Sequence, residues 1–371
     1  MSDEMVFMQR AIALAEQGRG ATAPNPCVGA VLVRDQTIVA EGWHRAYGQP
    51  HAEVEVLADA ARNNVDPAQC TLYVTLEPCH HHGKTPPCTQ AIVKAGIPAV
   101  VMGCLDPNTS VPGGGKAFLE QHGITVRHGL CAQACQDLIA DFQIWQTTDR
   151  PYVIAKLATT LDGKIATRTG HAAWISSEQS RAEVHALRSW CQAVLVGGET
   201  YRADNPALTC RLPGYTGPQP LAVVVTRTLP KPDQSSFLLT ERPDQTIFCT
   251  TEAEAKSARA ESLKEHHVRV WGLPAAQGML DLREGLRLLR ATLGCHYVLT
   301  EGGGHLSASL HMHTVLDELR IYQAMKILGD ADGRSAFAGR NVHNMRDAWK
   351  FRLLEQRWVD TDLYLRLRPM E

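Results

Sequence analysis

The residues with the clearest chemical potential lie between positions 51 and 88. The chain reads Pro50-His51-Ala52-Glu53, later Glu77-Pro78-Cys79, and then Pro87-Cys88. One imidazole and two thiolates suit Zn²⁺, and three protein ligands leave its fourth tetrahedral position for water. Two thiolates also balance the charge of the metal. The pattern predicts one Zn²⁺ per chain, with His51, Cys79 and Cys88 as its ligands.

Glu53 follows the first predicted ligand by two positions, which favours a role in proton transfer. H-x-E followed by P-C-x-x-C is the signature of zinc deaminases, whose glutamate carries a proton from activated water to the leaving amine. Here residues 80–87 separate the two cysteines, a longer gap than the signature has. The residues alone leave open a catalytic zinc, a structural zinc completed by His80, His81 or His82, or no metal. Since residues two apart diverge in mid-helix, we place His51 in the first turn of a helix, with Glu53 beside the open position.

Three longer motifs in the first half resemble those of the riboflavin-biosynthesis pyrimidine deaminases. They are Pro24-Asn25-Pro26-Cys27-Val28-Gly29, the segment from Glu77 to Cys88, and Asp106-Pro107-Asn108. The resemblance implies that Asn25 holds the pyrimidine and that the substrate site is lined by His81, Lys84, Asp106 and Asn108. The residue types agree, because an Asn can bond a base edge and a Lys suits a phosphate. His44, His122 and His128 are interpreted as surface or satisfied core residues.

A glycine triplet marks the second half. Glu301-Gly302-Gly303-Gly304-His305-Leu306 stands between an expected strand and an expected helix, where glycines let backbone N–H groups approach a phosphate. A tight turn without a ligand is the alternative. No G-x-G-x-x-G turn follows the first strand, so a Rossmann domain is not expected.

In order along the chain, this triplet and four other segments resemble the dihydrofolate-reductase-like domain of riboflavin biosynthesis. The other segments are 156–158, 161–164, 174–177 and 197–211. The resemblance implies NADPH-dependent reduction of a ribosylamine to a ribityl chain. The implied cofactor positions are Ala158, Trp174, Thr200, Asp204, Gly303, Gly304, His305, Leu306, Ser307, Ala308 and Ser309. The implied substrate positions are Ala172 (where a Ser is common), Arg188, Leu208, Arg211 and Glu301, and the two arginines suit a 5′-phosphate.

Two further expectations come from residue chemistry in this half. Lys156 and Glu301 are candidates for activating the carbon that receives the hydride, although either alone could form a surface ion pair. Arg227, between Thr226 and Thr228 and after an expected strand, could bind the 2′-phosphate that distinguishes NADPH from NADH. The alternative for Arg227 is a solvated turn residue.

The elements that would position these residues are those of two α/β domains. In the first half, strands are expected at 28–33, 37–40, 71–76, 99–103 and 124–127, among helices that include 51–62, 89–95 and 131–145. This alternation predicts a three-layer α/β/α sandwich of the cytidine-deaminase type. In the second half, strands are expected at 152–158, 193–196, 221–225, 246–249 and 297–300, and helices at 177–190 and 282–293. Alternating runs near 319–328 and 358–367 complete an α/β domain of the dihydrofolate-reductase type.

The polar stretch from Thr147 to Pro151 divides the chain into expected domains 1–147 and 150–371. The chain has 371 residues, with 37 basic against 39 acidic side chains, a formal net charge of −2. This balance disfavours a protein held on nucleic acid or anionic lipid by bulk charge. There is no recognisable signal peptide or transmembrane run, and eleven scattered cysteines favour metal binding or buried thiols over disulfides. A cytoplasmic location is therefore expected.

Together the two resemblances predict a bifunctional deaminase–reductase of riboflavin biosynthesis that acts on small phosphorylated pyrimidines, away from nucleic acid and membrane, and that could form a homo-oligomer. It would deaminate 2,5-diamino-6-ribosylamino-4(3H)-pyrimidinone 5′-phosphate and then reduce the ribosyl group to give 5-amino-6-ribitylaminouracil 5′-phosphate. A rival is a nucleic-acid-editing zinc deaminase with an RNA-binding C-terminal half, disfavoured by the net charge and by 6% aromatic content. A third interpretation pairs a structural zinc with a nucleotide-sensing half.

Overall fold

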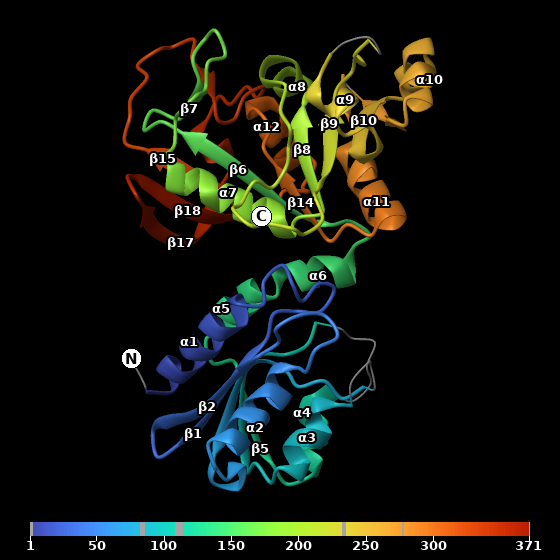
Figure 1. Ribbon diagram of the computed structural model, residues 1–371. Helices are drawn as coiled ribbons and strands as arrows, with labels where there is room; N and C mark the ends of the chain where they lie inside the picture. Colours follow the sequence, from blue (N-terminus) through green and yellow to red (C-terminus); the bar gives the residue numbers. More distant parts are fainter. Residues whose placement is uncertain (1–2, 82–85, 108–113, 232–234, 277, 371) are drawn as a thin grey trace. The chain divides into compact units, whose positions relative to one another are not determined.

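The computed structural model describes residues 3–81, 86–107, 114–231, 235–276 and 278–370. The chain forms two compact units, Met1–Thr148 and Asp149–Glu371 (Figure 1). Each unit has its own sheet, of five strands in the first and nine in the second. No helix of the described residues is long and apolar enough to cross a membrane.

The first unit is built on a mixed sheet with strand order β2-β1-β3-β4-β5. Its strands are β1 (Gly29–Arg34), β2 (Thr37–Trp43), β3 (Thr71–Leu76), β4 (Ala99–Cys104) and β5 (Thr125–His128). β1 pairs antiparallel with β2 and β3, whereas β3, β4 and β5 are parallel. The turn of the β1–β2 hairpin uses Asp35 and Gln36, both with positive φ, which is the backbone that the right-handed twist of a tight hairpin requires.

Helices cover both faces of this sheet, which confirms the expected three-layer sandwich. They are α1 (Asp3–Glu16), α2 (Ala52–Arg62), α3 (Cys88–Lys94), α4 (Gly114–Gln121), α5 (Ala132–Leu138) and α6 (Ala140–Thr147). α1 contacts α5, while α3 contacts both α2 and α4, so two groups of helices form the outer layers (Figure 1). α1 packs so closely on β1 that a Cβ on Gly29 would lie 2.0 Å from the Ala11 carbonyl oxygen.

The single helix expected over 131–145 is wrong, because the segment forms α5 and α6 with a break at Ile139. Ile139 has φ −104° and ψ 17°, outside the helical range. At the break, the Leu138 carbonyl accepts a hydrogen bond from the Arg19 guanidinium at 2.8 Å, and Arg19 also pairs with buried Asp141 at 2.9 Å. A side chain from the loop after α1 thus satisfies a carbonyl that would bond within a continuous helix.

The second unit is built on a sheet with order β11-β10-β9-β8-β14-β6-β15-β18-β17. The strands are β6 (Tyr152–Thr159), β8 (Ala193–Gly197), β9 (Leu221–Val225), β10 (Thr246–Thr251), β11 (Arg269–Leu273), β14 (Tyr297–Thr300), β15 (Glu318–Ala324), β17 (Phe351–Val359) and β18 (Asp362–Pro369). From β11 to β15 all neighbours are parallel, and β18 and β17 extend the edge antiparallel. The run expected near 358–367 is therefore part of a hairpin and not one strand.

The helices of this unit are α7 (Glu178–Trp190), α8 (Gly198–Asp204), α9 (Phe237–Thr240), α10 (Ala258–Glu265), α11 (Leu282–Leu293) and α12 (Gly304–Met312). Ser177 caps α7, since its side chain accepts a hydrogen bond from the Ser180 N–H. Two small ribbons, β7 (Lys164–Ala166) with β16 (Arg334–Ser335) and β12 (Ala275–Ala276) with β13 (Met279–Leu280), lie apart from the main sheet.

The parallel arrangement decides where a ligand site can form in the second unit. β8, β14 and β9 end at the same edge of the sheet, and they are followed by α8, by the glycine triplet and by Arg227 respectively. Ligands of open parallel sheets bind outside the carboxyl ends of the strands. The fold therefore brings several of the expected cofactor positions to one edge.

Candidate active sites

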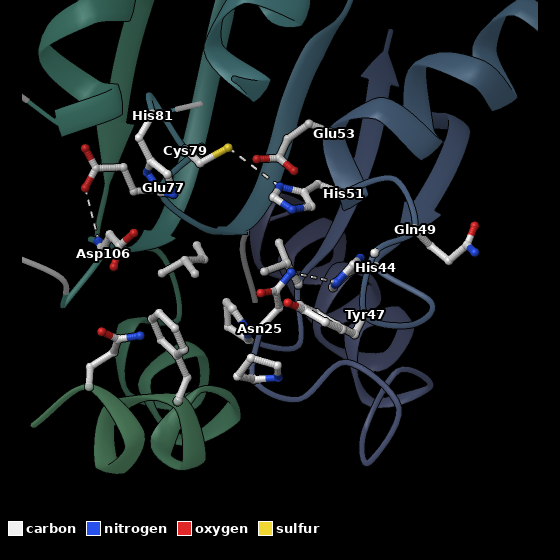
Figure 2. A pocket seen from close by; sticks show the side chains of 17 residues that line it. Asn25, His44, Tyr47, Gln49, His51, Glu53, Glu77, Cys79, His81 and Asp106 are labelled. Atoms are coloured by element: carbon white, nitrogen blue, oxygen red, sulfur yellow. Dashed lines mark hydrogen bonds between the residues drawn. The ribbon is translucent and has the colours of Figure 1, made fainter. Parts of the chain in front are cut away.

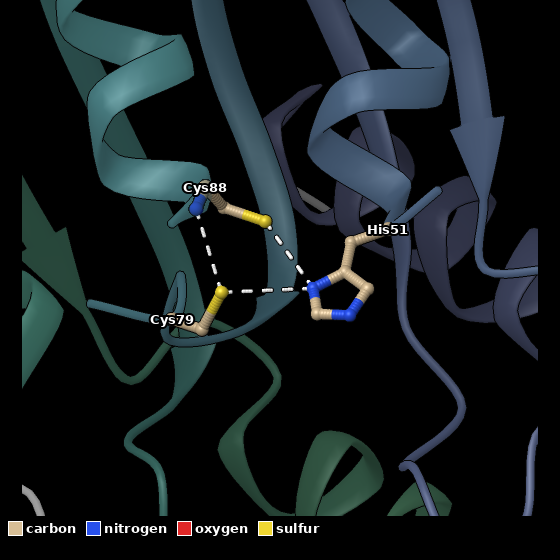
Figure 3. A group of neighbouring side chains, drawn as sticks. All are labelled: His51, Cys79 and Cys88. Carbon is tan, nitrogen blue, oxygen red and sulfur yellow. Dashed lines mark hydrogen bonds between the residues drawn. The ribbon is translucent and has the colours of Figure 1, made fainter. Parts of the chain in front are cut away.

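The predicted zinc ligands of the first unit meet in space. The ligand atoms of His51, Cys79 and Cys88 all lie within 4.8 Å of one another. The Nδ1 atom of His51 lies 3.6 Å from the Cys79 sulfur and 3.3 Å from the Cys88 sulfur (Figure 3). The backbone N–H of Cys88 also donates to the Cys79 sulfur at 3.4 Å. One borderline nitrogen and two soft sulfurs at this spacing fit Zn²⁺, with three protein ligands and a place for water.

Element ends supply each of these ligands. His51 is the N-cap of α2, Cys79 lies in the loop after β3, and Cys88 is the first residue of α3. His51 is extended, with φ −74° and ψ 165°, so the expectation that it sits within the first helical turn is wrong by one position. An extended N-cap also removes the difficulty of two helical residues that diverge, because only Glu53 belongs to the helix.

The two thiols of this group have pKa values shifted in opposite directions. Hydrogen bonding with the Cys88 thiol and with His51 lowers the pKa of Cys79, whereas the Cys79 thiolate and burial raise the pKa of Cys88. The pKa of His51 is raised, chiefly by its hydrogen bond to Cys79. The surroundings of Cys79 therefore favour its thiolate, the form in which a cysteine binds a metal ion.

Glu53, the expected acid–base residue, also belongs to this site. It lies in the first turn of α2, is only 3% exposed, and lines the same cavity as His51 and Cys79 (Figure 2). Burial, followed by the negative charge of Cys79, raises the pKa of Glu53 to about 7. A carboxyl group with such a pKa can both take up and release a proton near neutrality.

The cavity beside these residues has a volume of about 320 Å³ and is lined by residues of the first unit only. Three of the expected substrate residues, Asn25, His81 and Asp106, line it (Figure 2). Lys84 and Asn108, the other two expected substrate residues, lie outside the described residues. A concave site with a few convergent polar groups is what a small ligand requires.

Several residues of the cavity were not expected from the sequence. His44, Tyr47, Gln49, Glu77, Phe142 and Gln146 all line it. His44 is buried with both ring nitrogens in contact with polar atoms, so the expected satisfied core histidine is also part of the cavity wall. Its position directly after the last residue of β2 was the signal in the sequence that could have identified it.

Glu77 connects the loop that bears the metal ligand Cys79 to the next loop of the site. Its carboxylate accepts hydrogen bonds from the backbone N–H groups of Asp106, at 3.1 Å, and Lys116, at 2.8 Å. These bonds hold Asp106 at the cavity wall. Glu77 therefore positions the backbone of Asp106 and Lys116.

In the second unit, the expected substrate residues Arg188 and Glu301 form a partly buried ion pair. The Nε and Nη2 atoms of Arg188 donate to the two carboxylate oxygens of Glu301 at 2.5 and 2.8 Å, and Nη1 donates to the Thr209 carbonyl at 2.8 Å. The side chains are 11% and 14% exposed. Although burial opposes it, Arg188, and then Lys156, lower the pKa of Glu301. The pair joins α7 to the end of β14.

Lys156, on β6, belongs to the same charged group. Burial lowers the pKa of Lys156, while the negative charge of Glu301 opposes that shift. Its ammonium also lies 5.9 Å from the centre of the Tyr322 ring. Burial and a nearby carboxylate thus act in opposite directions on the charge of this lysine.

The other expected substrate residues lie in two loops. Ala172 is exposed between β7 and α7, and buried Leu208 has a positive φ of 52° in the loop after α8. Arg211 is exposed, its backbone N–H donates to Nδ1 of His185 at 3.2 Å, and its guanidinium lies 3.5 Å from the Thr209 hydroxyl. Arg188 and Arg211 thus flank Thr209.

The expected cofactor residues lie near the carboxyl ends of the parallel strands. Ala158 is on β6, Thr200 and Asp204 are on α8, and Gly303 is the N-cap of α12, which contains residues 304–309. A Cβ on Gly303 would meet nothing within 4 Å, whereas one on Gly304 would lie 2.3 Å from the Ser335 carbonyl oxygen. Gly303 thus leaves room beside the turn, and Gly304 permits close packing.

Two cofactor candidates are exposed. Trp174 is 70% exposed, with the Arg181 guanidinium 4.4 Å from its ring centre. The Arg227 guanidinium donates to the Gly278 carbonyl at 2.8 Å, and the neighbouring Arg202 donates to the Thr226 hydroxyl at 3.4 Å. Arg227 and Thr226 thus stand directly after the end of β9, each with a different partner.

Comparison with known proteins identifies relatives of both halves. Residues 1–104 match the cytidine and deoxycytidylate deaminase zinc-binding region, and residues 151–365 match the RibD C-terminal domain. The chain is 37% identical to the riboflavin biosynthesis protein RibD of Bacillus amyloliquefaciens, over 99% of this chain and 97% of that protein. It is also 37% identical to RibD of Escherichia coli, over 99% of both.

Solved structures agree over the full length. The chain is similar to Acinetobacter baumannii RibD, with a TM-score of 0.76 at 34% identity over 100% of this chain and 99% of that one. It is also similar to a Thermotoga maritima protein described as a diaminohydroxyphosphoribosylaminopyrimidine deaminase/5-amino-6-(5-phosphoribosylamino)uracil reductase. That likeness has a TM-score of 0.77 at 36% identity and covers 100% of both chains.

Proposed function

Because this chain belongs to the RibD family of bifunctional riboflavin-biosynthesis enzymes, we propose that residues 1–147 perform its deamination and residues 150–371 its reduction. The first reaction is hydrolytic deamination of 2,5-diamino-6-ribosylamino-4(3H)-pyrimidinone 5′-phosphate. The second uses NADPH to reduce the ribosyl group, giving 5-amino-6-ribitylaminouracil 5′-phosphate. The observation that carries the proposal is the convergence of His51, Cys79, Cys88 and Glu53 on one cavity.

In the deaminase half, His51, Cys79 and Cys88 would hold Zn²⁺, which when bound makes water a nucleophile at neutral pH. Glu53 accepts the proton that this water loses and delivers it to the departing amine. Asn25, His81 and Asp106 bind and orient the pyrimidine, and Glu77 keeps Asp106 in place. Lys84 and Asn108 are assigned to the same pocket from their motifs.

In the reductase half, NADPH when bound supplies the hydride. The cofactor would lie against Ala158, Trp174, Thr200, Asp204, Arg227 and the segment 303–309. Arg188 holds the Glu301 carboxylate in one orientation, and Lys156 stands beside it to donate a proton to the sugar oxygen or nitrogen. Ala172, Leu208 and Arg211 complete the proposed sugar-phosphate site.

The competing functions have less support. A nucleic-acid-editing deaminase would not need a reductase half, yet the RibD C-terminal model matches residues 151–365. A structural zinc would need a fourth protein ligand. Of the three candidates, His80 stands 3.1 Å from the Thr89 hydroxyl and stacks on Phe118, and His81 lines the cavity. The third, His82, lies outside the described residues.

The test measures both activities on the full chain. We expect one zinc per chain and release of ammonia from the free phosphorylated pyrimidine, followed by NADPH oxidation with the deaminated product. Bound zinc without ammonia release would favour the structural-zinc alternative, and deamination of RNA in place of the free pyrimidine would favour the editing alternative.

The domain limits are tested separately. A fragment from residue 150 onward should be soluble and should bind NADPH, because the second unit has its own sheet and core. An aggregated fragment, with the full chain active, would show that the halves need each other. A homo-oligomer, measured by light scattering, and a cytoplasmic location belong to the same proposal.

A further inference from the structure

His44 is held at the wall of the deaminase cavity by both its backbone and its ring. It follows the last residue of β2 and is 2% exposed. Its backbone N–H donates to the Val28 carbonyl at 2.9 Å, and its ring packs edge to face on the ring of His51, with centroids 5.1 Å apart. The side chain therefore has one defined position beside the proposed metal ligand.

The partner of one ring nitrogen fixes the position of the proton on this ring. Nδ1 of His44 lies 3.0 Å from the carbonyl oxygen of Pro50. A carbonyl oxygen can only accept, so Nδ1 must carry the hydrogen. The second ring nitrogen, Nε2, faces the amide nitrogen of Asn25, which can only donate, so Nε2 carries no hydrogen and accepts.

This bare nitrogen determines which way the Asn25 amide faces. The Nδ2 atom of Asn25 lies 3.3 Å from Nε2 of His44 (Figure 2). With Nε2 as an acceptor, Nδ2 donates to it. The opposite amide orientation would place the Oδ1 lone pairs against the lone pair of Nε2. Asn25 lines the cavity, so Oδ1 is the atom that remains available to a ligand there.

We infer that His44 is a positioning residue which locks the Asn25 amide so that the pocket offers a hydrogen-bond acceptor to the pyrimidine edge. The inference rests on the proposed deaminase function and adds a reason for substrate choice. A 2-aminopyrimidin-4-one carries N–H groups on its ring and its amine, and these complement an acceptor. The bare N3 of a cytosine edge would face Oδ1 with a second acceptor, and an unmatched buried acceptor pair is costly.

Two substitutions of His44 separate its two hydrogen bonds. His44→Asn can place an amide N–H near Nδ1 and keep the Pro50 bond, but it cannot reach Asn25. His44→Gln can place a carbonyl oxygen near Nε2 and so keep an acceptor for Asn25. In the zinc-loaded full chain, we expect His44→Asn to raise the deaminase KM by roughly 10- to 100-fold, about the value of one oriented hydrogen bond. His44→Gln should recover most of that loss, and zinc content and NADPH oxidation should not change in either variant.

A double-mutant cycle distinguishes positioning from a merely structural role. If His44 acts through Asn25, then His44→Asn should change KM by less than about 3-fold in an Asn25→Ala background. The inference would be overturned if the KM increases of the two single variants multiplied in the double variant. It would also be overturned by equal losses in the His44→Asn and His44→Gln variants, or by loss of zinc in both. Failure of the wild-type protein to release ammonia would instead reject the proposed function, on which the substrate part of this inference rests.

A spectroscopic measurement tests the proton position without any turnover. The ¹⁵N chemical shifts of the His44 ring in the zinc-loaded protein should show a protonated Nδ1 and a bare Nε2. A protonated Nε2 would overturn the inference even if the enzyme is an active deaminase.

Discussion

The two candidate sites of this chain are held together by different interactions. The deaminase site joins ends of β3, α2 and α3 through a group of metal-ligating atoms, and its wall is fixed by hydrogen bonds of His44 and Glu77. The candidate reductase site contains a partly buried ion pair between Arg188 and Glu301, which are 113 positions apart. A metal ion selects its ligands by their chemistry. A charge shielded from water destabilises the folded protein when its partner is removed. Damage to the first site should therefore cost activity, and damage to the second should also cost stability.

The largest effect that would establish this contrast is expected from Glu53→Gln. The amide cannot accept and release the proton, so the rate of ammonia release should fall roughly 10²- to 10⁴-fold. Zinc content, thermal stability and NADPH oxidation with the deaminated substrate should stay near their wild-type values. The matched control is Glu55→Gln in the same helical turn, because Glu55 pairs with the exposed Arg45 at 3.4 Å. Deamination at the wild-type rate by the Glu53 variant would show that another residue moves the proton.

In the second site, Arg188→Met should reduce stability as well as activity. The variant leaves the partly buried carboxylate of Glu301 without its bidentate partner, and the loss of stability should approach the roughly 3–5 kcal/mol typical of a broken buried pair. We expect reductase activity to disappear and the denaturant midpoint of the second unit to fall, while deamination persists. Arg357→Met is the control, since Arg357 makes a similar two-bond pair with Glu183 at 2.8 Å but is 42% exposed. An exposed pair contributes about 0–1 kcal/mol, so equal losses in the two variants would contradict the contrast.

A smaller effect is expected at Arg227, on cofactor choice alone. Removing the guanidinium in Arg227→Ala should reduce the preference for NADPH over NADH by about 10- to 150-fold, the value of one charged contact of roughly 1.5–3 kcal/mol. Arg227→Lys should retain most of the preference because it keeps the charge. The measurement is kcat/KM with each cofactor. An unchanged ratio in the alanine variant would mean that Arg227 only fastens the turn at Gly278.

The smallest expected effect concerns Asp162 in the second unit. Hydrogen bonds from Thr160 and from the backbone N–H groups of Gly329 and Leu328 lower the pKa of Asp162 to about 2. Because the folded pKa lies below the ordinary value of 3.8, the contribution of Asp162 to stability is present above pH 3.8 and is lost as the pH falls through about 2. The difference in melting temperature between wild type and Asp162→Asn should therefore shrink on acidification from pH 4 to 2. A difference that grows instead would reverse the sign of this contribution.

The sequence predicted best what depends on local pattern. The helix expected over 282–293 is α11, whose leucines at 282, 286, 289 and 293 recur at helical spacing. The two cysteines and His51, chosen by ligand type, come together in a group that could hold a metal ion. The break between α5 and α6 could not be predicted. It depends on Arg19, a residue of the loop after α1 that reaches the Leu138 carbonyl across the unit.

The roles that the sequence did not reveal depend on contacts between distant segments. His44 and Glu77 have no distinctive motif of their own, and each acts through the backbone or amide of another loop. Arg188 and Glu301 were both expected at the substrate site, but only the fold shows that they bind each other. Hydrogen-bond partners 19 to 113 positions apart leave no periodic signal in one sequence.

The division of the chain into two contiguous units has a genetic consequence. The deaminase cavity is lined by residues 24–146, and the candidate reductase residues all follow residue 149. Two alleles, one carrying Glu53→Gln and the other a substitution confined to the reductase site, would each leave the opposite catalyst intact. Supplied together in one cell that lacks this gene, they should restore riboflavin prototrophy, because the intermediate released by one polypeptide can be used by the other.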